Sequence, residues 1–372
     1  MSSPVPPNAE RIHILGAGNL GQYLARGLTR QNPLHPVTLL LHRPSLLQDW
    51  ESAGSAIECE TNGQVDHTTG ISVELIDGDE DGDGAAPGVD GSSGIKNLIV
   101  ACKTYMTVPA LRRVRNRLDE GSTIVFLQNG MGTTEEVTKQ LFPSVSTRPA
   151  YWAGICVLGV SSKKPFSIIP TGIGHITLGP VGNTLSPDST TNSTSSHSPS
   201  NFMIQQLVQT QDPTSTVVSP TDLRKAQLLK LVANAIVNPL TTILSCKNAQ
   251  LLDHDSTVAL IKVLIKEAGP VIRALLPHPH PTGSESDAVD FSDEKLLEYV
   301  LMVIRKTATN TSSMLQDARS GKRTEIDYIN GFIASQGERM GHLCPNHAIA
   351  VAMVQRGESV RAEHLGSRFD FN

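Results

Sequence analysis

The chain has 372 residues, 18% of them charged, and a formal net charge of -5 at pH 7. This length suits two or three domains with ample core, and the negative charge, without a basic stripe interleaved with aromatic residues, argues against nucleic-acid binding. No apolar run approaches the ~20 residues that span a bilayer, and residues 1–8 lack the apolar core of a signal peptide. We therefore expect a cytoplasmic protein that binds neither nucleic acid nor membrane.

The first predicted elements are a strand at residues 12–15, a glycine-rich loop and a helix at 22–30. The loop consists of Gly16, Ala17, Gly18, Asn19, Leu20 and Gly21. In a strand–GxGxxG–helix unit the first glycine allows a tight turn and the second lets the backbone approach a pyrophosphate, while the third lets the helix pack on the strand. The helix N-terminus attracts the phosphates. The segment predicts dinucleotide binding more strongly than a ligand-free glycine-rich turn.

The second predicted strand, residues 37–41, ends at His42 and Arg43, and no acidic residue follows before Asp49. An NAD site usually has an Asp or Glu here to bind the ribose 2′-hydroxyl. A guanidinium group suits a 2′-phosphate instead. The sequence thus favours NADP(H), with Arg43 or His42 at the phosphate; the alternative is an ordinary surface arginine.

Two further predicted strands end in polar residues. Residues 97–103 end at Lys103, and residues 123–129 end at Asn129, which precedes Gly130. Ligands of open α/β sheets bind at the carboxyl ends of the strands. Lys103 and Asn129 are therefore expected beside the cofactor or the substrate.

We predict an α/β fold of two domains. Residues 1–219 form a Rossmann-type doubly wound sheet, finished by strands at 174–179 and 216–219 and a helix at 201–210, and residues 220–372 form an all-helical domain. Helical periodicity marks 223–245, 257–276, 293–316 and 324–340. The active site is expected in the cleft between the domains.

Three segments are predicted to be loop insertions, at about 77–94, 182–200 and 277–290, because they are too polar or glycine-rich to pack. His278 and His280 in the third are interpreted as solvent-exposed, and no metal site is predicted. The 5 cysteines are scattered without a CxxC motif, which is typical of reduced thiols.

A polar stripe marks the first helix of the second domain. Lys230, Asn234 and Asn238 recur every four residues, and the residues between them are apolar. Polar groups on an apolar helix are costly unless something polar faces them. In one interpretation the lysine extends to solvent from the edge of the helix and the two amides are hydrogen-bonded within the core. In the other, the three residues form part of a ligand site. Pro239 predicts a kink or break after Asn238, or a helix end capped by Asn238.

Residues 312–331 mix acids and hydroxyls with apolar residues at helical spacing. This pattern indicates a pair of amphipathic helices that turn at Gly321. Spacing alone does not distinguish Glu325 from Asp327 as a functional acid.

Together these segments resemble the ketopantoate reductase (2-dehydropantoate 2-reductase) family. The matching words are GAGNLG at 16–21, QNGMGT at 128–133, KLVANAIVNPLTTIL at 230–244 and SSMLQDARSGKRTEIDYINGF at 312–332. They occur in the family's order and span most of the chain, and the last two are long and specific. The resemblance implies a Rossmann domain followed by a helical domain.

The resemblance also implies residue roles. Lys230 corresponds to the catalytic proton donor, and Glu325 to the acid that holds the substrate and supports that lysine. The substrate-binding residues implied are Asn129, Asn234, Asn238 and Ser313, with Asn129 also touching the cofactor. The cofactor residues implied are 16–21, Lys103 and either Arg43 or His42. The choice between Arg43 and His42 stays open because the segment after Val37 is one residue longer than the family pattern leads us to expect.

The implied reaction is the NADPH-dependent reduction of 2-dehydropantoate to (R)-pantoate in pantothenate and coenzyme A biosynthesis. A first alternative keeps the fold and catalysis but changes the substrate to another 2-keto acid. A second is a non-catalytic NADP(H) sensor, which the presence of Lys230 and Glu325 disfavours. The sequence leaves monomer and homodimer open.

Overall fold

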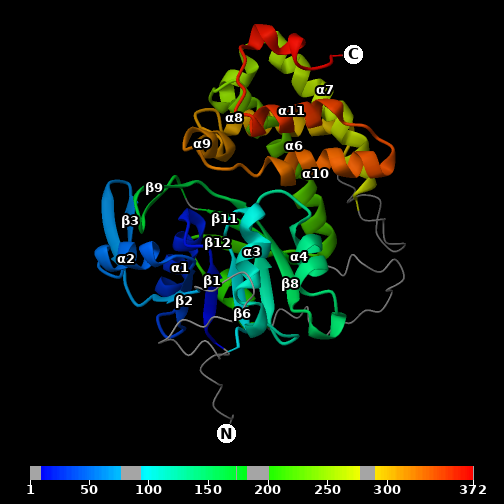
Figure 1. Ribbon diagram of the computed structural model, residues 1–372. Coiled ribbons are helices and arrows are strands. Elements are labelled where there is room, and N and C mark those ends of the chain that lie inside the picture. Colours follow the sequence, from blue (N-terminus) through cyan, green and yellow to red (C-terminus); the bar gives the residue numbers. More distant parts are fainter. Residues whose placement is uncertain (1–9, 77–93, 173, 182–200, 277–289, 372) are drawn as a thin grey trace. The chain divides into compact units, whose positions relative to one another are not determined.

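The computed structural model describes residues 10–76, 94–172, 174–181, 201–276 and 290–371 (Figure 1). The chain forms two compact units. The first holds the described residues up to Gln128 together with Thr133–Leu223, and the second holds Asn129–Gly132 and the described residues from Arg224 onward. Apart from Gly94 and Asp290, the predicted insertions at 77–94, 182–200 and 277–290 lie outside the described residues, as do His278 and His280.

The first unit is built on an eight-stranded sheet within the described residues, in the order β12-β11-β8-β7-β6-β1-β2-β5. The strands from β5 to β8 are parallel, and in chain order they read 3-2-1-4-5-6, the Rossmann arrangement. The Rossmann-type fold is confirmed, although β8 and β11 pair antiparallel. The strands are β1 Ile12–Leu15, β2 Val37–Leu41, β5 Ser72–Leu75, β6 Asn97–Val100, β7 Thr123–Phe126, β8 Ala150–Val157, β11 His175–Pro180 and β12 Thr214–Val217.

Helices cover both faces of this sheet because its central strands are apolar on both sides. Ile14 and Leu39 belong to one buried cluster, whereas their neighbours Leu15 and Leu40 belong to another, as the two-residue period of a strand requires. The first cluster includes residues of α1 Asn19–Gln31, α2 Pro44–Ser52 and α5 Phe202–Gln209. The second includes residues of α3 Thr107–Arg112 and α4 Thr133–Leu141.

A smaller four-stranded sheet, which sequence analysis does not predict, has the order β4-β3-β10-β9. Its strands are β3 Ile57–Thr61, β4 Gln64–Thr68, β9 Val160–Lys164 and β10 Ser167–Pro170. They are short, and β4 and β9 are largely exposed, so they carry little apolar periodicity.

The second unit is helical from Arg224 onward, which confirms the predicted helical C-terminal region. Its helices are α6 Pro220–Ile243, which begins in the first unit, α7 Asp255–Ala274, α8 Asp293–Lys306, α9 Ser313–Arg319, α10 Ile326–Met340 and α11 Pro345–Gln355. Within the described residues, the short 3-10 helices are η1 Thr104–Met106, η2 Arg115–Arg117, η3 Val145–Thr147, η4 Asn248–Leu252 and η6 Ala362–Ser367. The predicted continuous segment 293–316 is wrong, because α8 ends at Lys306 and Ser312 caps a new helix. None of the described helices is long and apolar enough to cross a bilayer.

Buried polar contacts hold α11 against α7. Glu267 accepts hydrogen bonds from the backbone N–H groups of Asn346 at 3.1 Å and His347 at 3.2 Å, which lie in the first turn of α11 and have no acceptor within the helix. His347 is fully buried, and its Nε2 donates to the carbonyl of Leu264 at 3.0 Å. Burial lowers the pKa of His347 to about 4, so its ring is neutral near pH 7.

His347 should make the fold sensitive to acid. Because its pKa is about 4 in the folded protein and 6.5 for an ordinary histidine, the unfolded chain takes up the proton first as the pH falls. Stability is therefore present above about pH 6.5 and is lost as the pH falls toward 4. We predict that this group alone lowers the free energy of unfolding by about 2 kcal/mol between pH 7 and pH 5.

Urea denaturation of the native chain and His347→Asn at both pH values checks this. The variant should lose less stability on acidification. His13, whose pKa burial lowers to about 3, contributes equally to both proteins. An equal loss in the two proteins would contradict the assignment.

Candidate functional site

The glycine loop between β1 and α1 has the geometry of a dinucleotide-binding turn. Gly16 has a φ of +119°, and a Cβ there would lie 2.5 Å from the backbone nitrogen of Cys102. A Cβ on Gly21 would lie 1.8 Å from the carbonyl oxygen of Gly16. Both positions thus require glycine. Gly18 is exposed, and a Cβ there meets no atom within 4 Å, so its backbone is open to a pyrophosphate.

Side chains fix this loop without covering the start of α1. Gly18 is the N-cap, no side chain caps it, and the first turn holds no acid. The amide of Asn19 donates to the carbonyl of Val160 on β9 at 2.9 Å. Ala17 and Leu20 pack against the apolar core. The segment therefore fits a bound phosphate at the helix N-terminus.

The carboxyl end of β2 carries a group of basic side chains. His42 and Arg43 are both exposed there. Arg113, at the end of α3, donates from Nη1 to the carbonyl of His42 at 3.2 Å and to that of Ile76 at 3.4 Å. Burial, then Arg43, then Arg113 lower the pKa of His42. Among the described basic residues at this strand end, Arg43 and Arg113 thus carry the permanent positive charges at neutral pH.

Sequence analysis does not identify Arg113, which is separated from His42 by 71 positions and belongs to no motif. The predicted cofactor residue Lys103 follows β6 and is partly buried. Its carbonyl accepts from the N–H of Met106 at 2.8 Å and so starts η1. Lys103 therefore follows the carboxyl end of β6, although the strand ends at Val100 and does not reach Lys103 as predicted. Its contact with a cofactor stays a prediction.

The second unit carries the polar stripe on α6. Steps of four residues rotate by ~40° and rise by ~6 Å, so Lys230, Asn234 and Asn238 share one face of the helix. Lys230 and Asn234 are partly buried, and Asn238 is 7% exposed. The opposite faces belong to the apolar core of the unit.

Pro239 neither breaks nor ends α6, contrary to two of the outcomes predicted for it. The helix continues to Ile243, so Asn238 is not a cap. The hydroxyl of Thr242 donates to the carbonyl of Asn238 at 2.7 Å. Asn330 donates to the carbonyl of Ala235 at 2.8 Å, which is the carbonyl left without a helical donor by the proline. A side chain from α10 thus replaces the one backbone donor that the proline removes.

The loop Asn129–Gly132 packs on the start of α10, as its place in the second unit requires. Gly130 has a φ of +81°, and a Cβ there would lie 2.4 Å from the carbonyl oxygen of Tyr328. That oxygen accepts from the N–H of Met131 at 2.9 Å. The amide of Asn129 donates to Oε2 of Glu325 at 3.1 Å. Asn129 and Glu325, two predicted site residues that lie 196 positions apart, are therefore in contact.

The surroundings distinguish Glu325 from Asp327, which spacing does not. Glu325 is 6% exposed. Asp327 instead pairs with Arg323 at 2.9 Å and accepts from Gln355 at 2.6 Å. Only the first of these two acids is buried, as expected for a group whose charge acts on a ligand.

The two serines before α9 differ in their surroundings. Ser313, the predicted substrate contact, is exposed at the first position of the helix. Ser312 is buried, accepts from the N–H of Leu315 at 3.2 Å, and lies 2.7 Å from the hydroxyl of Thr241 on α6. Ser312, which sequence analysis leaves without a role, thus fixes the place of Ser313. The predicted cleft between the domains stays a prediction.

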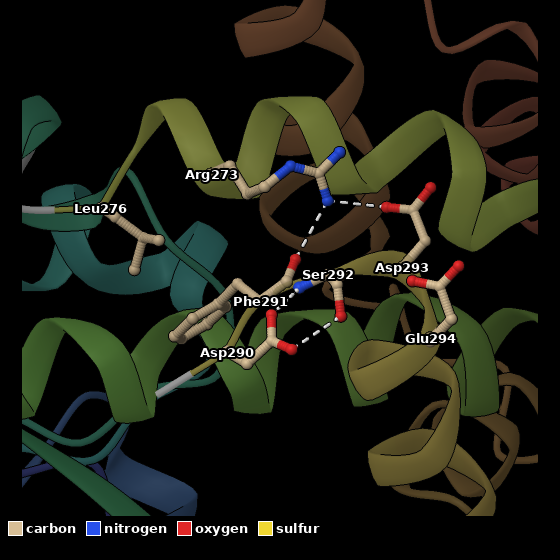
Figure 2. Close-up of a pocket in the computed structure, with 7 residues that line it drawn as sticks. All are labelled: Arg273, Leu276, Asp290, Phe291, Ser292, Asp293 and Glu294. Atoms are coloured by element: carbon tan, nitrogen blue, oxygen red, sulfur yellow. Dashed lines mark hydrogen bonds and ion pairs between the residues drawn. The ribbon is translucent and has the colours of Figure 1, made fainter. Parts of the chain in front are cut away.

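A hollow of about 740 Å³ lies elsewhere in the second unit, beside α7 and the start of α8 (Figure 2). Arg273 is already paired there with Asp293 at 2.7 Å, and Asp290 and Glu294 add negative charge. It contains none of the predicted site residues, and its acidic lining does not suit an anionic keto acid. Among the described residues, no group of three or more His, Cys, Asp or Glu could hold a metal ion.

Comparison with known sequences covers most of the chain. Residues 12–183 match the family described as "Ketopantoate reductase PanE/ApbA", and residues 222–358 match "Ketopantoate reductase PanE/ApbA C terminal". The 2-dehydropantoate 2-reductase of Yersinia pestis is 31% identical over 265 residues, which cover 70% of this chain and 74% of the relative. The ketoisovalerate reductase of Beauveria bassiana is 27% identical over 366 residues, covering 89% and 79%.

Solved structures share the fold. The probable 2-dehydropantoate 2-reductase panE of Bacillus subtilis has a TM-score of 0.68 and 23% identity, covering 94% of this chain and 100% of the other. A D-mandelate dehydrogenase solved with NADH and anilino(oxo)acetate has a TM-score of 0.72 and 18% identity, covering 96% and 99%. At these identities the likeness concerns the fold alone.

Proposed function

The chain belongs to the ketopantoate reductase family, and from this premise we propose that it reduces 2-dehydropantoate to (R)-pantoate with NADPH, a step toward pantothenate and coenzyme A. The observation that carries the proposal is the contact of Asn129 with the buried carboxylate of Glu325, at 3.1 Å. Two motifs that lie 196 positions apart meet there, in the unit that also carries Lys230. Its cytoplasmic location and its state as monomer or homodimer stay predictions.

In the proposed mechanism Lys230 polarises the keto oxygen of the substrate and donates a proton to it. Glu325 holds the substrate and supports the lysine, and Asn129 orients the Glu325 carboxylate. Asn234, Asn238 and Ser313 bind the remaining polar groups of the substrate. Amides and a hydroxyl suit a molecule with a carboxylate and a hydroxyl group.

NADPH supplies the hydride for this reaction when bound. The backbone of residues 16–21 would hold its pyrophosphate, since Gly18 is open and the start of α1 carries no acid. Arg43 and Arg113 would bind the 2′-phosphate, and Lys103 would contact the cofactor from the end of β6. The D-mandelate dehydrogenase contains NADH, but the basic residues at the end of β2 favour the phosphorylated cofactor here.

Reduction of ketoisovalerate is the second candidate, favoured by the likeness to the Beauveria bassiana enzyme over 89% of this chain. The two keto acids share the 2-keto carboxylate and differ by one hydroxymethyl group. A site that hydrogen-bonds a substrate hydroxyl rejects the analogue lacking it by up to about 10⁵-fold, whereas an apolar pocket discriminates weakly. Residues that bind this hydroxyl would therefore decide the substrate.

The proposal is tested by the rate of NADPH oxidation with ketopantoate, ketoisovalerate and pyruvate. We expect kcat/KM for ketopantoate to exceed that for ketoisovalerate by at least about 100-fold. Asn234→Ala and Asn238→Ala should narrow this ratio if their amides bind the hydroxyl. A ratio that favours ketoisovalerate would transfer the proposal to the second candidate. NADPH binding without turnover of any keto acid would favour the sensor and contradict both.

Lys230→Ala should lower kcat by about 10²–10⁴-fold, because the proton donor is lost. NADPH binding should be unchanged, since residues 16–21, Arg43 and Lys103 belong to the first unit. Lys225→Ala is the matched control, because this lysine lies on the same helix but roughly 140° around it. Equal rates in the two variants would remove the proton-donor role from Lys230.

Arg113→Ala should weaken NADPH binding by about 10-fold through the loss of one charged hydrogen bond, with little change for NADH. Fluorescence titration of both cofactors measures this. Arg112→Ala is the control. It removes the same charge from the neighbouring position, but the guanidinium of Arg112 contacts Gln140 and not the end of β2. A similar weakening for NADPH and NADH would exclude a role for Arg113 at the 2′-phosphate.

A further inference from the structure

Pro239 leaves one carbonyl of α6 without its helical donor. In an α-helix the N–H of residue 239 would bond to the carbonyl of Ala235, and proline has no N–H. Asn330 of α10 supplies the donor instead, since its Nδ2 lies 2.8 Å from that oxygen. Asn330 is 0% exposed, so no water can replace it without opening the core.

The amide of Asn330 has one permitted orientation. Its Nδ2 also lies 3.0 Å from Nδ1 of His347. Because Nε2 of His347 donates to the carbonyl of Leu264, Nδ1 of the neutral ring is an acceptor. Both neighbours of the Asn330 amide are therefore acceptors, so its NH₂ group must face them. The orientation that lets Asn330 bond Ala235 is thus set by His347 of α11, whose own orientation is set by Leu264 of α7.

This hydrogen bond connects the two segments that carry the proposed catalytic pair. Lys230 lies five residues before Ala235, and Glu325 lies five residues before Asn330. The bond therefore fixes the register of α10 against α6. Along the axis of each segment it lies about 7.5 Å from Lys230 and from Glu325, respectively.

We propose that Asn330 is a positioning residue that sets the place of Glu325 relative to Lys230 by bonding the carbonyl that Pro239 releases. This inference rests on the proposed function, in which those two residues act on the substrate. Asn330 acts through the register of the two helices and not on the reacting atoms. A misplacement of about 1 Å in such a pair can cost 10²-fold in rate.

The test compares the native chain with Asn330→Ala, Pro239→Ala and the double variant. In Asn330→Ala a buried carbonyl loses its only replacement donor, so both Tm and kcat should fall, the latter by at least about 10-fold. Pro239→Ala restores a backbone N–H at that place and keeps Asn330, so its kcat should stay within about twofold of native. In the double variant the backbone N–H satisfies the carbonyl while the contact between helices stays absent.

The double variant separates positioning from simple stability. We expect its Tm to rise above that of Asn330→Ala, because the carbonyl of Ala235 regains a donor, and to stay below that of Pro239→Ala, because Nδ1 of His347 has lost its donor. Its kcat should stay at least about 10-fold below that of Pro239→Ala, and its kcat–pH profile should differ from that of the native chain. Recovery of both Tm and kcat would overturn the positioning role. So would a native kcat in Asn330→Ala. A native chain inactive with every keto acid would instead overturn the proposed function.

Discussion

The buried carboxylate of Glu325 is the constraint around which the second unit is arranged. A carboxylate that is 6% exposed must be hydrogen-bonded, and Asn129 supplies an amide at 3.1 Å. Asn129 reaches it because the loop to Gly132 packs on the carbonyl of Tyr328, where Gly130 alone leaves room. Gly130 of the QNGMGT word therefore serves close packing beside this acid. A flexible turn does not explain it.

Much of the fold is predictable because its signals are local. Strands β1 and β2 are mostly apolar runs with one polar residue each, and the glycines between β1 and α1 follow a recognisable spacing that their steric surroundings explain. The four-residue spacing of Lys230, Asn234 and Asn238 likewise needs only the helical period. The small sheet is not predictable in this way, because β4 and β9 are polar, exposed and paired through strands from distant segments.

Parts of the candidate site depend on contacts between distant residues, which local patterns do not encode. Arg113 meets the carbonyl of His42 across 71 positions, and Asn330 meets that of Ala235 across 95. Pro239 shows the consequence. Its local effect on helices predicts a break, yet α6 continues because a side chain from α10 replaces the lost donor. Ser312 is a similar case, since its contact with Thr241 joins α9 to α6.

Family membership and chemistry constrain the function to different degrees. The match to both ketopantoate reductase segments and the contact of Asn129 with the buried Glu325 favour reduction of a 2-keto acid. The choice between ketopantoate and ketoisovalerate depends on a single hydroxymethyl group. In the proposed function, that choice rests on which of the amides on α6 meets the hydroxyl of the substrate. In the proposed function, cofactor choice depends separately on the two guanidinium groups at the end of β2.

The most direct test of the central claim is a crystal structure of the protein with NADP⁺ and pantoate. The account predicts that Nζ of Lys230 lies about 2.7–3.2 Å from the C2 hydroxyl oxygen of pantoate. It also predicts that the carboxylate of Glu325 bonds the ligand while keeping its contact with Asn129. Pantoate bound with its C2 hydroxyl beyond hydrogen-bond distance of Lys230, or held by residues other than this set, would contradict the account.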